Sequence, residues 1–308
     1  MKYYLLLITL LVTFINTHAQ TDIDGLIMKK KELCLGTSLA NTSFTKYWEG
    51  TLKRNNLNLG TVSNTAIMPM CNYGITNKLN ILAAIPYIST KASAGQLAGQ
   101  RGMQDANVFV KYVPYTTQLY KGTLNTIVVV GASTPTTSYT PDLLPLSIGL
   151  QSKQLITRLM VDYQRGHWFG TASGSYIYRG NVTLSRATYY TTRMHYTNQV
   201  AMPTVTNVNI RGGYRSTQVI AEANLNRWVT NGGFDISRNN MPFVSNTMNS
   251  TTAGLHVKYL AKFVQGLSID ADALTTIAGR NVGQSSGVSV GVFYIFNFGK
   301  KFEKKIAN

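Results

Sequence analysis

Charged and apolar side chains alternate in several segments of the chain, so acids and bases gather on one face of an extended strand. In residues 218–229, for example, Glu222 shares its parity with Asn224 and lies opposite Ala223 and Leu225. Carboxylates and cations on one inward face can pair with each other or contact a passing polar solute. The candidate lumen-lining polar residues are Asp105, Lys111, Arg158, Asp162, Arg179, Arg211, Glu222, His256, Lys258, Asp270 and Asp272.

Two interpretations of these charged groups stay open. In a narrow barrel they would pair across the interior and fill it, because a buried charge needs a partner. If water remains among them, the same groups would line a pore and set its selectivity. The sequence predicts about twelve strands, as set out below. This number lies between the strand numbers of small filled barrels and of wide porins, so it does not decide between a filled and an open lumen.

Several motifs of soluble enzymes are absent from the sequence. The chain has no HExxH, no CxxC and no phosphate-binding glycine loop. The histidines beyond the first twenty residues, His167, His195 and His256, are far apart and lack metal-ligand spacing. We therefore expect no catalytic residue, no metal site and no cofactor. A membrane lipid hydrolase, which needs a serine beside a histidine, is the weakest alternative.

The two cysteines, Cys34 and Cys71, lie near the start of the first predicted strand and the end of the second. These strand ends meet in an antiparallel hairpin, so a disulfide is geometrically allowed in an oxidising compartment. Opposite side-chain parity would instead keep the two thiols apart. The register of the hairpin decides between these outcomes, and the sequence leaves it open.

The charged candidates require strands to position them. The last apolar segment reads SGVSVGVFYIFNF and places Val288, Val290 and Phe296 on one parity, opposite Ser289 and Gly291. A period of two predicts a β-strand. Similar runs give about twelve predicted strands. They cover residues 33–41, 57–70, 79–90, 104–115, 122–134, 147–163, 167–179, 204–214, 218–229, 251–260, 267–278 and 286–298.

The connections between these segments alternate in length. Those after even-numbered segments are tight, as around Gly166, whereas those after odd-numbered segments are mostly long, as in 180–203 and 230–250. Up-and-down transmembrane barrels have this asymmetry, with short periplasmic turns and long extracellular loops. Aromatic residues near the strand ends, such as Tyr87 and Trp228, predict girdles at the two bilayer interfaces.

Residues 1–19 have the order of a secretory signal peptide. Lys2 is followed by the apolar residues 5–15 and then by Thr17-His18-Ala19, a small-x-small cleavage site. The apolar stretch is too short to span a membrane as a helix. We expect cleavage after Ala19, a polar lead-in over residues 20–32, and a barrel over residues 33–298.

The composition agrees with an exported membrane barrel. The 308 residues carry a net charge of +17, yet only 13% are charged and 18 are tyrosine; soluble proteins usually have about a quarter charged residues. Basic clusters at residues 29–31 and 300–305 flank the first and last predicted strands and suit acidic lipid head groups. Because the chain is exported, we expect no nucleic-acid partner.

Two segments resemble a known family. NYGITNKLNILAAIPYIST, residues 72–90, resembles the "YG-[IL]-T-[ND]" hairpin of the outer-membrane proteins grouped as phenol-degradation meta-pathway transporters. GMQDANVFVKYVPY, residues 102–115, resembles the segment that follows it, although Met103-Gln104 replace the usual x-Gly before Asp105. The resemblance implies a barrel that passes small, often hydrophobic molecules through the outer membrane.

These observations predict an all-β fold, a single transmembrane antiparallel up-and-down barrel in the outer membrane of a Gram-negative bacterium. The predicted function is a channel for small molecules, hydrophobic or aromatic ones among them, by passive diffusion. A structural or partner-binding barrel with a plugged lumen is the alternative. Expected partners are outer-membrane lipid, a small-molecule solute and the outer-membrane assembly machinery. Residues 299–308 should form a basic periplasmic tail after the closing strand.

Overall fold

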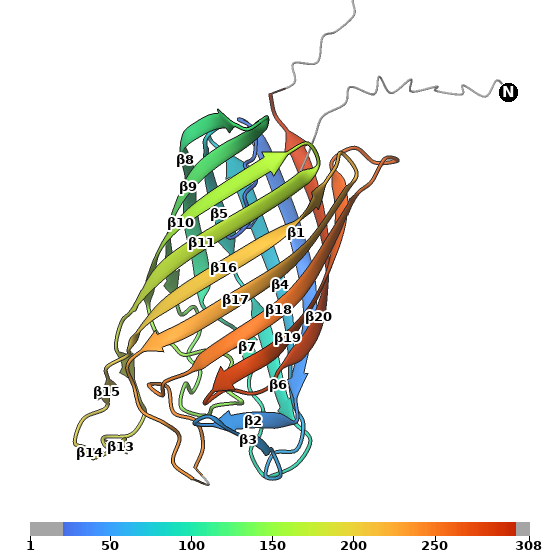
Figure 1. Ribbon diagram of the computed structural model, residues 1–308. Helices are drawn as coiled ribbons and strands as arrows, with labels where there is room; N and C mark the ends of the chain where they lie inside the picture. Colours follow the sequence, from blue (N-terminus) through green and yellow to red (C-terminus); the bar gives the residue numbers. More distant parts are fainter. Residues whose placement is uncertain (1–20, 239, 300–308) are drawn as a thin grey trace, which may run out of the picture.

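The computed structural model describes residues 21–238 and 240–299, which form an all-β structure (Figure 1). The predicted signal peptide and all but the first residue of the predicted basic tail lie outside the described residues. No helix in the described part of the chain is long and apolar enough to cross a membrane.

Twelve wall strands close into an antiparallel barrel, which confirms the predicted fold class. One of the twelve is divided into β5 and β6. The wall consists of β1 (Glu32–Phe44), β4 (Val62–Gly74), β5 (Leu79–Ala84) with β6 (Tyr87–Ala92), β8 (Ala106–Leu119), β9 (Gly122–Thr134), β10 (Gln154–Arg165), β11 (Trp168–Arg179), β16 (Thr204–Arg215), β17 (Val219–Asn231), β18 (Asn249–Leu260), β19 (Leu267–Arg280) and β20 (Ser286–Asn297).

The barrel closes between the first and last strands. β1 pairs with β4 on one side and with β20 on the other, in a register that places Leu39 opposite Val290. This pairing provides hydrogen-bond partners for the backbone N–H and C=O groups of both sheet edges. The membrane core contains no water that could hydrogen-bond these groups instead. The last strand therefore pairs with the first, as a closed up-and-down barrel requires.

Two prolines explain why one wall strand is divided. Pro86 lies between β5 and β6, and Pro69 lies in the neighbouring strand β4. β4 pairs with β5 through residues 70–74 and with β6 through residues 62–67. Proline has no N–H to donate to a ladder, so pairing is interrupted where the two prolines lie close together.

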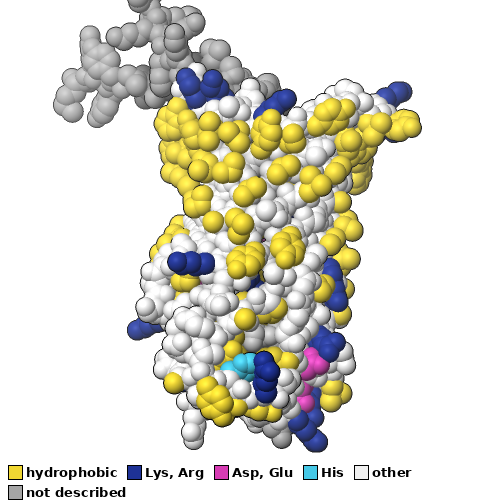
Figure 2. All heavy atoms as spheres, turned by 90° about the vertical axis from the view of Figure 1, so that its left-hand side faces the viewer, with side chains coloured by type: hydrophobic (Ala, Val, Ile, Leu, Met, Phe, Trp, Pro, Cys, Tyr) yellow, Lys and Arg dark blue, Asp and Glu magenta, His cyan; other side chains and the backbone are white. Residues whose placement is uncertain are grey.

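Side chains alternate between an apolar outer face and a more polar inner face. Outward-facing Leu39 and Val288 are 55% and 61% exposed, whereas inward-facing Asn209 and Ser175 are 3% and 5% exposed. Figure 2 shows hydrophobic side chains spread over the wall toward the upper end, while acidic side chains on this face appear only near the lower end. Apolar exterior and polar interior together are typical of a membrane barrel.

The connections differ at the two ends of the barrel, as predicted. One end, here called the turn end, has tight connections such as Tyr120-Lys121 between β8 and β9. The opposite loop end carries the short strands β2 (Lys46–Glu49), β3 (Leu52–Asn55), β7 (Arg101–Met103), β12 (Val182–Thr183), β13 (Tyr189–Tyr190), β14 (Met194–His195) and β15 (Gln199–Val200) (Figure 1).

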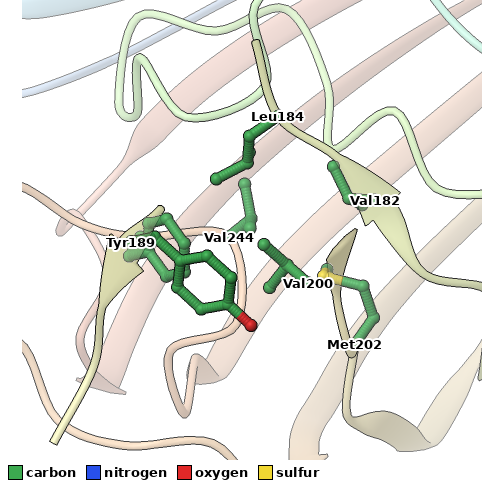
Figure 3. Close-up of a cluster of buried hydrophobic side chains, with 7 residues drawn as sticks. Val182, Leu184, Tyr189, Val200, Met202 and Val244 are labelled. Atoms are coloured by element: carbon green, nitrogen blue, oxygen red, sulfur yellow. The ribbon is translucent and has the colours of Figure 1, made fainter. Parts of the chain in front are cut away.

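The long loops at the loop end share a hydrophobic core of their own. Val182, Leu184 and Val200 pack with Phe243 and Val244 across two loops (Figure 3). Buried apolar contacts of this kind order segments that would otherwise be mobile. The loop end is therefore a packed structure with fixed surfaces.

Several predicted boundaries and positions were wrong. Residues 57–61 and 147–153 belong to loops, and Leu57 is 84% exposed. Apolar and polar residues also alternate in these loop segments. A period of two in the sequence therefore does not distinguish them from a strand. Trp228 does not join an outer girdle, because it has the inward parity of Glu222 and packs against Ile156 and other buried residues.

The disulfide that the sequence left open is not formed. Cys34 lies opposite Asn72 in the β1–β4 ladder, and Leu35 lies opposite Cys71. Residues directly opposite each other share a face, so the offset of one residue places the thiols on different faces of the wall. Cys34 is buried inside, and both cysteines are free.

Candidate functional site

Residues 21–31 run through the turn end of the lumen and are called the strap. The prediction of a polar lead-in here missed its apolar residues, which pack inside the lumen. Three consecutive strap side chains reach three inward-facing apolar clusters. Leu26 packs against Phe169, Ile220 and Leu260; Ile27 packs against Val113, Ile127, Val129 and Met160; Met28 packs with Cys34, Phe293 and Ile295. The strap thus contacts strands around much of the barrel circumference and occupies part of this end of the lumen.

Two ion pairs join the strap to the wall. The Lys111 ammonium, which is fully buried, donates to Asp24 Oδ1 at 2.9 Å and to the carbonyl oxygens of Asp24 and Thr21 at 2.7 and 2.9 Å. Arg158 Nη1 donates to Asp22 Oδ2 at 2.6 Å and to its carbonyl oxygen at 2.9 Å. Since Lys111 uses all three of its donors on the strap, this lysine holds the strap by geometry as well as by charge.

The ionisation of Asp24 depends on this arrangement. Burial alone raises the pKa of its carboxyl group, but the Lys111 ammonium and the N–H groups of Thr21 and Leu26 outweigh burial and lower the pKa to about 2. Asp24 is therefore a carboxylate at neutral pH. The pair contributes to strap docking over the whole physiological pH range.

Two glycines allow the strap to lie against the wall. A Cβ atom on Gly25 would come within 2.0 Å of the Asp162 carboxylate, and one on Gly74 within 2.0 Å of the Lys29 carbonyl oxygen. The Lys31 N–H donates to the Gly74 carbonyl oxygen at 2.8 Å. A larger residue at either glycine would displace the strap backbone from its contacts.

Asp162 lies beneath the strap in a network of its own. Arg215 Nη1 donates to both Asp162 oxygens, at 3.0 and 3.1 Å, and the Thr171 hydroxyl donates to one of them. The Arg215 guanidinium also lies 3.5 Å from the centre of the Phe169 ring. A cavity of about 310 Å³ adjoins this network at the turn end.

On the loop-end side of the strap, the wall carries two further ion pairs and a histidine–carboxylate hydrogen bond. Arg211 Nη1 lies 2.7 Å from Glu222 Oε1, and Lys258 Nζ lies 3.4 Å from Asp270 Oδ2. His256 Nδ1 lies 2.7 Å from Asp272 Oδ1. Each of the three contacts joins neighbouring strands, so the two ion pairs neutralise their charges along the wall and do not bridge the lumen.

A chamber of about 490 Å³ remains open between the strap and this wall. Thr21, Ile23, Asp24 and Leu26 of the strap form part of its lining. Seven of the predicted candidates also line it: Arg158, Arg211, Glu222, His256, Lys258, Asp270 and Asp272. The chamber is large enough for several water molecules and offers them polar partners.

The other predicted candidates lie elsewhere. Lys111 is covered by the strap, and Asp162 lies at the turn end. Asp105 lies at the loop end, where it accepts a hydrogen bond from the Tyr139 hydroxyl at 2.6 Å, and burial raises the pKa of its carboxyl group. Arg179 Nε donates to the Pro203 carbonyl oxygen at 2.7 Å. Asp105 and Arg179 thus anchor loops.

Sequence reasoning missed two parts of the lumen. One is the strap, whose signals are acids at alternate positions, Asp22 and Asp24, followed by the apolar residues 26–28. The other is an amide cluster in which Asn226 Oδ1 accepts from Asn207 at 2.9 Å and from Asn209 at 3.4 Å. These asparagines share the inward parity of the charged candidates and could have been added to them on that basis.

The chamber does not contain the nucleophile arrangement of a hydrolase at His256. The Ser289 hydroxyl donates to Asp272 Oδ2 at 2.9 Å, so the carboxylate lies between the serine and His256. In a Ser-His-Asp triad the histidine lies between the other two groups. In the part of the chain that the structure describes, no three His, Cys, Asp or Glu residues form a group that could hold a metal ion.

An apolar outer wall, a closed set of strands and a polar, partly filled lumen define a membrane β-barrel. No protein-family model matches the sequence, and no curated protein matches it. Among solved structures, an outer membrane channel from Pseudomonas putida is similar over 91% of this chain and 100% of that chain, with a TM-score of 0.70 and 12% identity. At this identity the similarity shows the fold, which is that of an outer-membrane barrel.

A second solved structure is similar at a lower level. The translocator domain of the autotransporter NalP from Neisseria meningitidis is similar over 88% of this chain and 90% of that chain, with a TM-score of 0.46 and 11% identity. That TM-score is too low to carry an argument about function.

Proposed function

We propose that the protein is an outer-membrane channel that lets small molecules diffuse passively through its lumen. The observation that carries the proposal is the chamber of about 490 Å³, which lies inside a closed barrel whose outer wall is apolar. Paired charges and amides line the chamber, so a solute meets polar groups without meeting a large uncompensated charge.

The proposal includes an orientation and a location. The turn end faces the periplasm and the loop end faces outward, in the outer membrane of a Gram-negative bacterium, because barrels of this class have short periplasmic turns and long outer loops. The signal peptide, residues 1–19, delivers the chain across the inner membrane. We assign the basic residues 299–308 to the periplasmic side, because they follow the closing strand in the sequence.

The resemblance of residues 72–90 and 102–115 to the phenol-degradation meta-pathway transporters supports a channel for small hydrophobic or aromatic solutes. The overall likeness to an outer membrane channel supports the channel function and leaves the solute class to the resemblance alone. In the proposed path, a solute enters from the loop end, crosses the chamber and leaves past the strap.

The strap also favours a second candidate function. With Asp22, Asp24 and residues 26–28 all engaged with the wall, the turn end is occupied, as expected of a plugged barrel whose loops bind a partner. Both candidates share the same fold. They differ in whether the strap leaves a path for solutes.

Conductance through planar bilayers separates the two candidates. Purified wild-type protein is compared with a variant that lacks residues 20–27, and folding of both is checked by mobility on unheated gels. A channel conducts in the wild-type form and conducts more without the strap. Conductance by the deletion variant alone supports the plugged barrel, and no conductance by either folded protein refutes the channel.

Uptake into liposomes tests the solute class separately. Proteoliposomes are given neutral aromatic solutes and neutral sugars of similar size. Faster entry of the aromatic solutes supports the hydrophobic or aromatic class, whereas equal entry of both supports a channel without that preference.

A further inference from the structure

A second cavity, of about 540 Å³, lies among the long loops at the loop end, separate from the lumen chamber. It is called the loop cavity. Its walls come from the end of β1 and from five loops. They are lined by Phe44, Tyr47, Asn56, Asn58, Leu59, Gly95, Gln96, Leu97, Leu144, Pro145, Ile236, Asn240, Met241, Pro242, Met248, Asn281, Val282 and Gly283. Its volume is within the range of small-molecule sites, about 300–1,000 Å³.

The chemistry of this lining differs from that of the lumen. None of the described residues that line the loop cavity is an Asp, Glu, Lys, Arg or His, whereas the chamber includes residues such as Arg211, Glu222 and Asp270. Apolar side chains dominate the walls, with a few asparagine and glutamine amides among them. A charged ligand would lose its hydration here without gaining an ionic partner, which is unfavourable. A neutral ligand avoids this cost.

The walls of the loop cavity are fixed before any ligand arrives. The Asn281 side chain accepts from the N–H groups of Gly50 and Ile236 at 2.8 and 3.1 Å, and donates to Asp235 and to the Thr247 carbonyl oxygen at 2.7 and 2.8 Å. One asparagine thereby joins three loops. Preformed walls reduce the entropy lost on binding.

Neighbouring contacts reinforce two sides of the cavity. Arg280 forms a bidentate ion pair with Asp235 just outside the lining. Its Nε donates to Asp235 Oδ1 at 2.7 Å, and its Nη2 donates to Asp235 Oδ2 at 2.6 Å. On another side, Leu144 packs against the hydrophobic core of the loops and also lines the cavity. The side chains of the site are thus held by packing and by hydrogen bonds.

We propose that the loop cavity is a binding site for a small uncharged molecule with a largely apolar body and one or a few hydrogen-bonding groups. The apolar side chains bury the body of the ligand, and the amides of Asn56, Asn58 and Gln96 supply donors and acceptors. Binding at this site does not require conduction through the lumen. Equilibrium binding therefore tests it independently of the channel function.

The test uses two probes of matched shape, neutral coumarin and anionic coumarin-3-carboxylate. Titration calorimetry is performed on the full chain in lipid nanodiscs, with empty nanodiscs subtracted. Coumarin should bind at least about tenfold more tightly than coumarin-3-carboxylate, because only the carboxylate must be desolvated without a partner. Absence of coumarin binding, or equal affinities for the two probes, would overturn the proposal.

Variants place the binding site within the loop cavity. Leu59→Asp and Leu97→Asp introduce a carboxylate into the lining and should each weaken coumarin binding by at least about tenfold. The matched control is Leu57→Asp, two residues from Leu59 but 84% exposed and outside the lining; it should leave affinity within about twofold. Wild-type affinity in both lining variants, with folding verified on unheated gels, would also overturn the proposal.

Discussion

Replacement of Lys111 by methionine should release the strap from the barrel. The ammonium is fully buried and donates all three of its hydrogen bonds to Thr21 and Asp24. In Lys111→Met the side chain keeps its length but leaves the Asp24 carboxylate buried without its cation. Removing one partner of a buried pair costs about 3–5 kcal/mol.

This loss of free energy lowers the stability of the docked strap, because the barrel strands keep their backbone hydrogen bonds to each other. At about 1.4 kcal/mol per tenfold change, the ratio of docked to undocked strap should fall by a factor of about one hundred to several thousand. Hydrogen–deuterium exchange of a peptide covering residues 21–31 measures this directly. Exchange should accelerate there, while peptides from the wall strands keep their protection.

Two further variants of the chain serve as controls for the hydrogen–deuterium exchange experiment. In the double variant Asp24→Leu with Lys111→Met, two apolar side chains replace the pair, and much of the protection should return because no charge is left unpaired. Lys91→Met, at an exposed lysine of β6, should behave as wild type. Unchanged protection of residues 21–31 in Lys111→Met alone would refute the role of this ion pair.

Acid should loosen the same segment. The pKa of Asp24 is lowered from 3.8 to about 2, which corresponds to about 2–3 kcal/mol of docking free energy at neutral pH. A lowered carboxyl pKa stabilises the docked state above about pH 4, and this contribution is lost as the pH falls toward 2. Strap protection in the wild type should decline over that interval, and the decline should be absent from the double variant.

Other predictions concern the wall. Val290→Arg, at an outward position in the middle of β20, should lower the free energy of unfolding in lipid vesicles by about 2–4 kcal/mol, measured by denaturant titration; no loss would contradict a lipid-facing wall. Mass spectrometry after alkylation should find two free thiols with or without reductant, and Cys34 should react only after unfolding, since it is buried. Deletion of residues 299–308 should leave membrane insertion intact, whereas Phe296→Asp should impair it; loss of insertion on tail deletion alone would contradict the position of the closing strand.

Local patterns were sufficient for the wall of the barrel. A period of two in residues 286–298 reports which side chains face each side of a strand, and it needs no knowledge of neighbours. The alternation of short and long connections likewise reports the up-and-down order of the strands. These features are local in sequence, so they could be predicted without knowledge of the register between strands.

Register and close packing were beyond such patterns. The alternation within β1 and within β4 does not by itself give their pairing, and only the register shows that Leu35, not Cys34, lies opposite Cys71. Inward parity selected Arg158, Glu222 and Asp270, but it did not tell which charges would line a chamber and which, like Arg179, would anchor a loop.

The strands, their up-and-down order and the polar character of the inner face follow from the sequence, because each depends on residues a few positions apart. The entry of the strap into the lumen is visible only in the folded barrel, because its partners Lys111 and Arg158 are 87 and 136 residues away from Asp24 and Asp22. The loop cavity likewise exists only in three dimensions, because its walls meet after the barrel has closed and its loops have packed together.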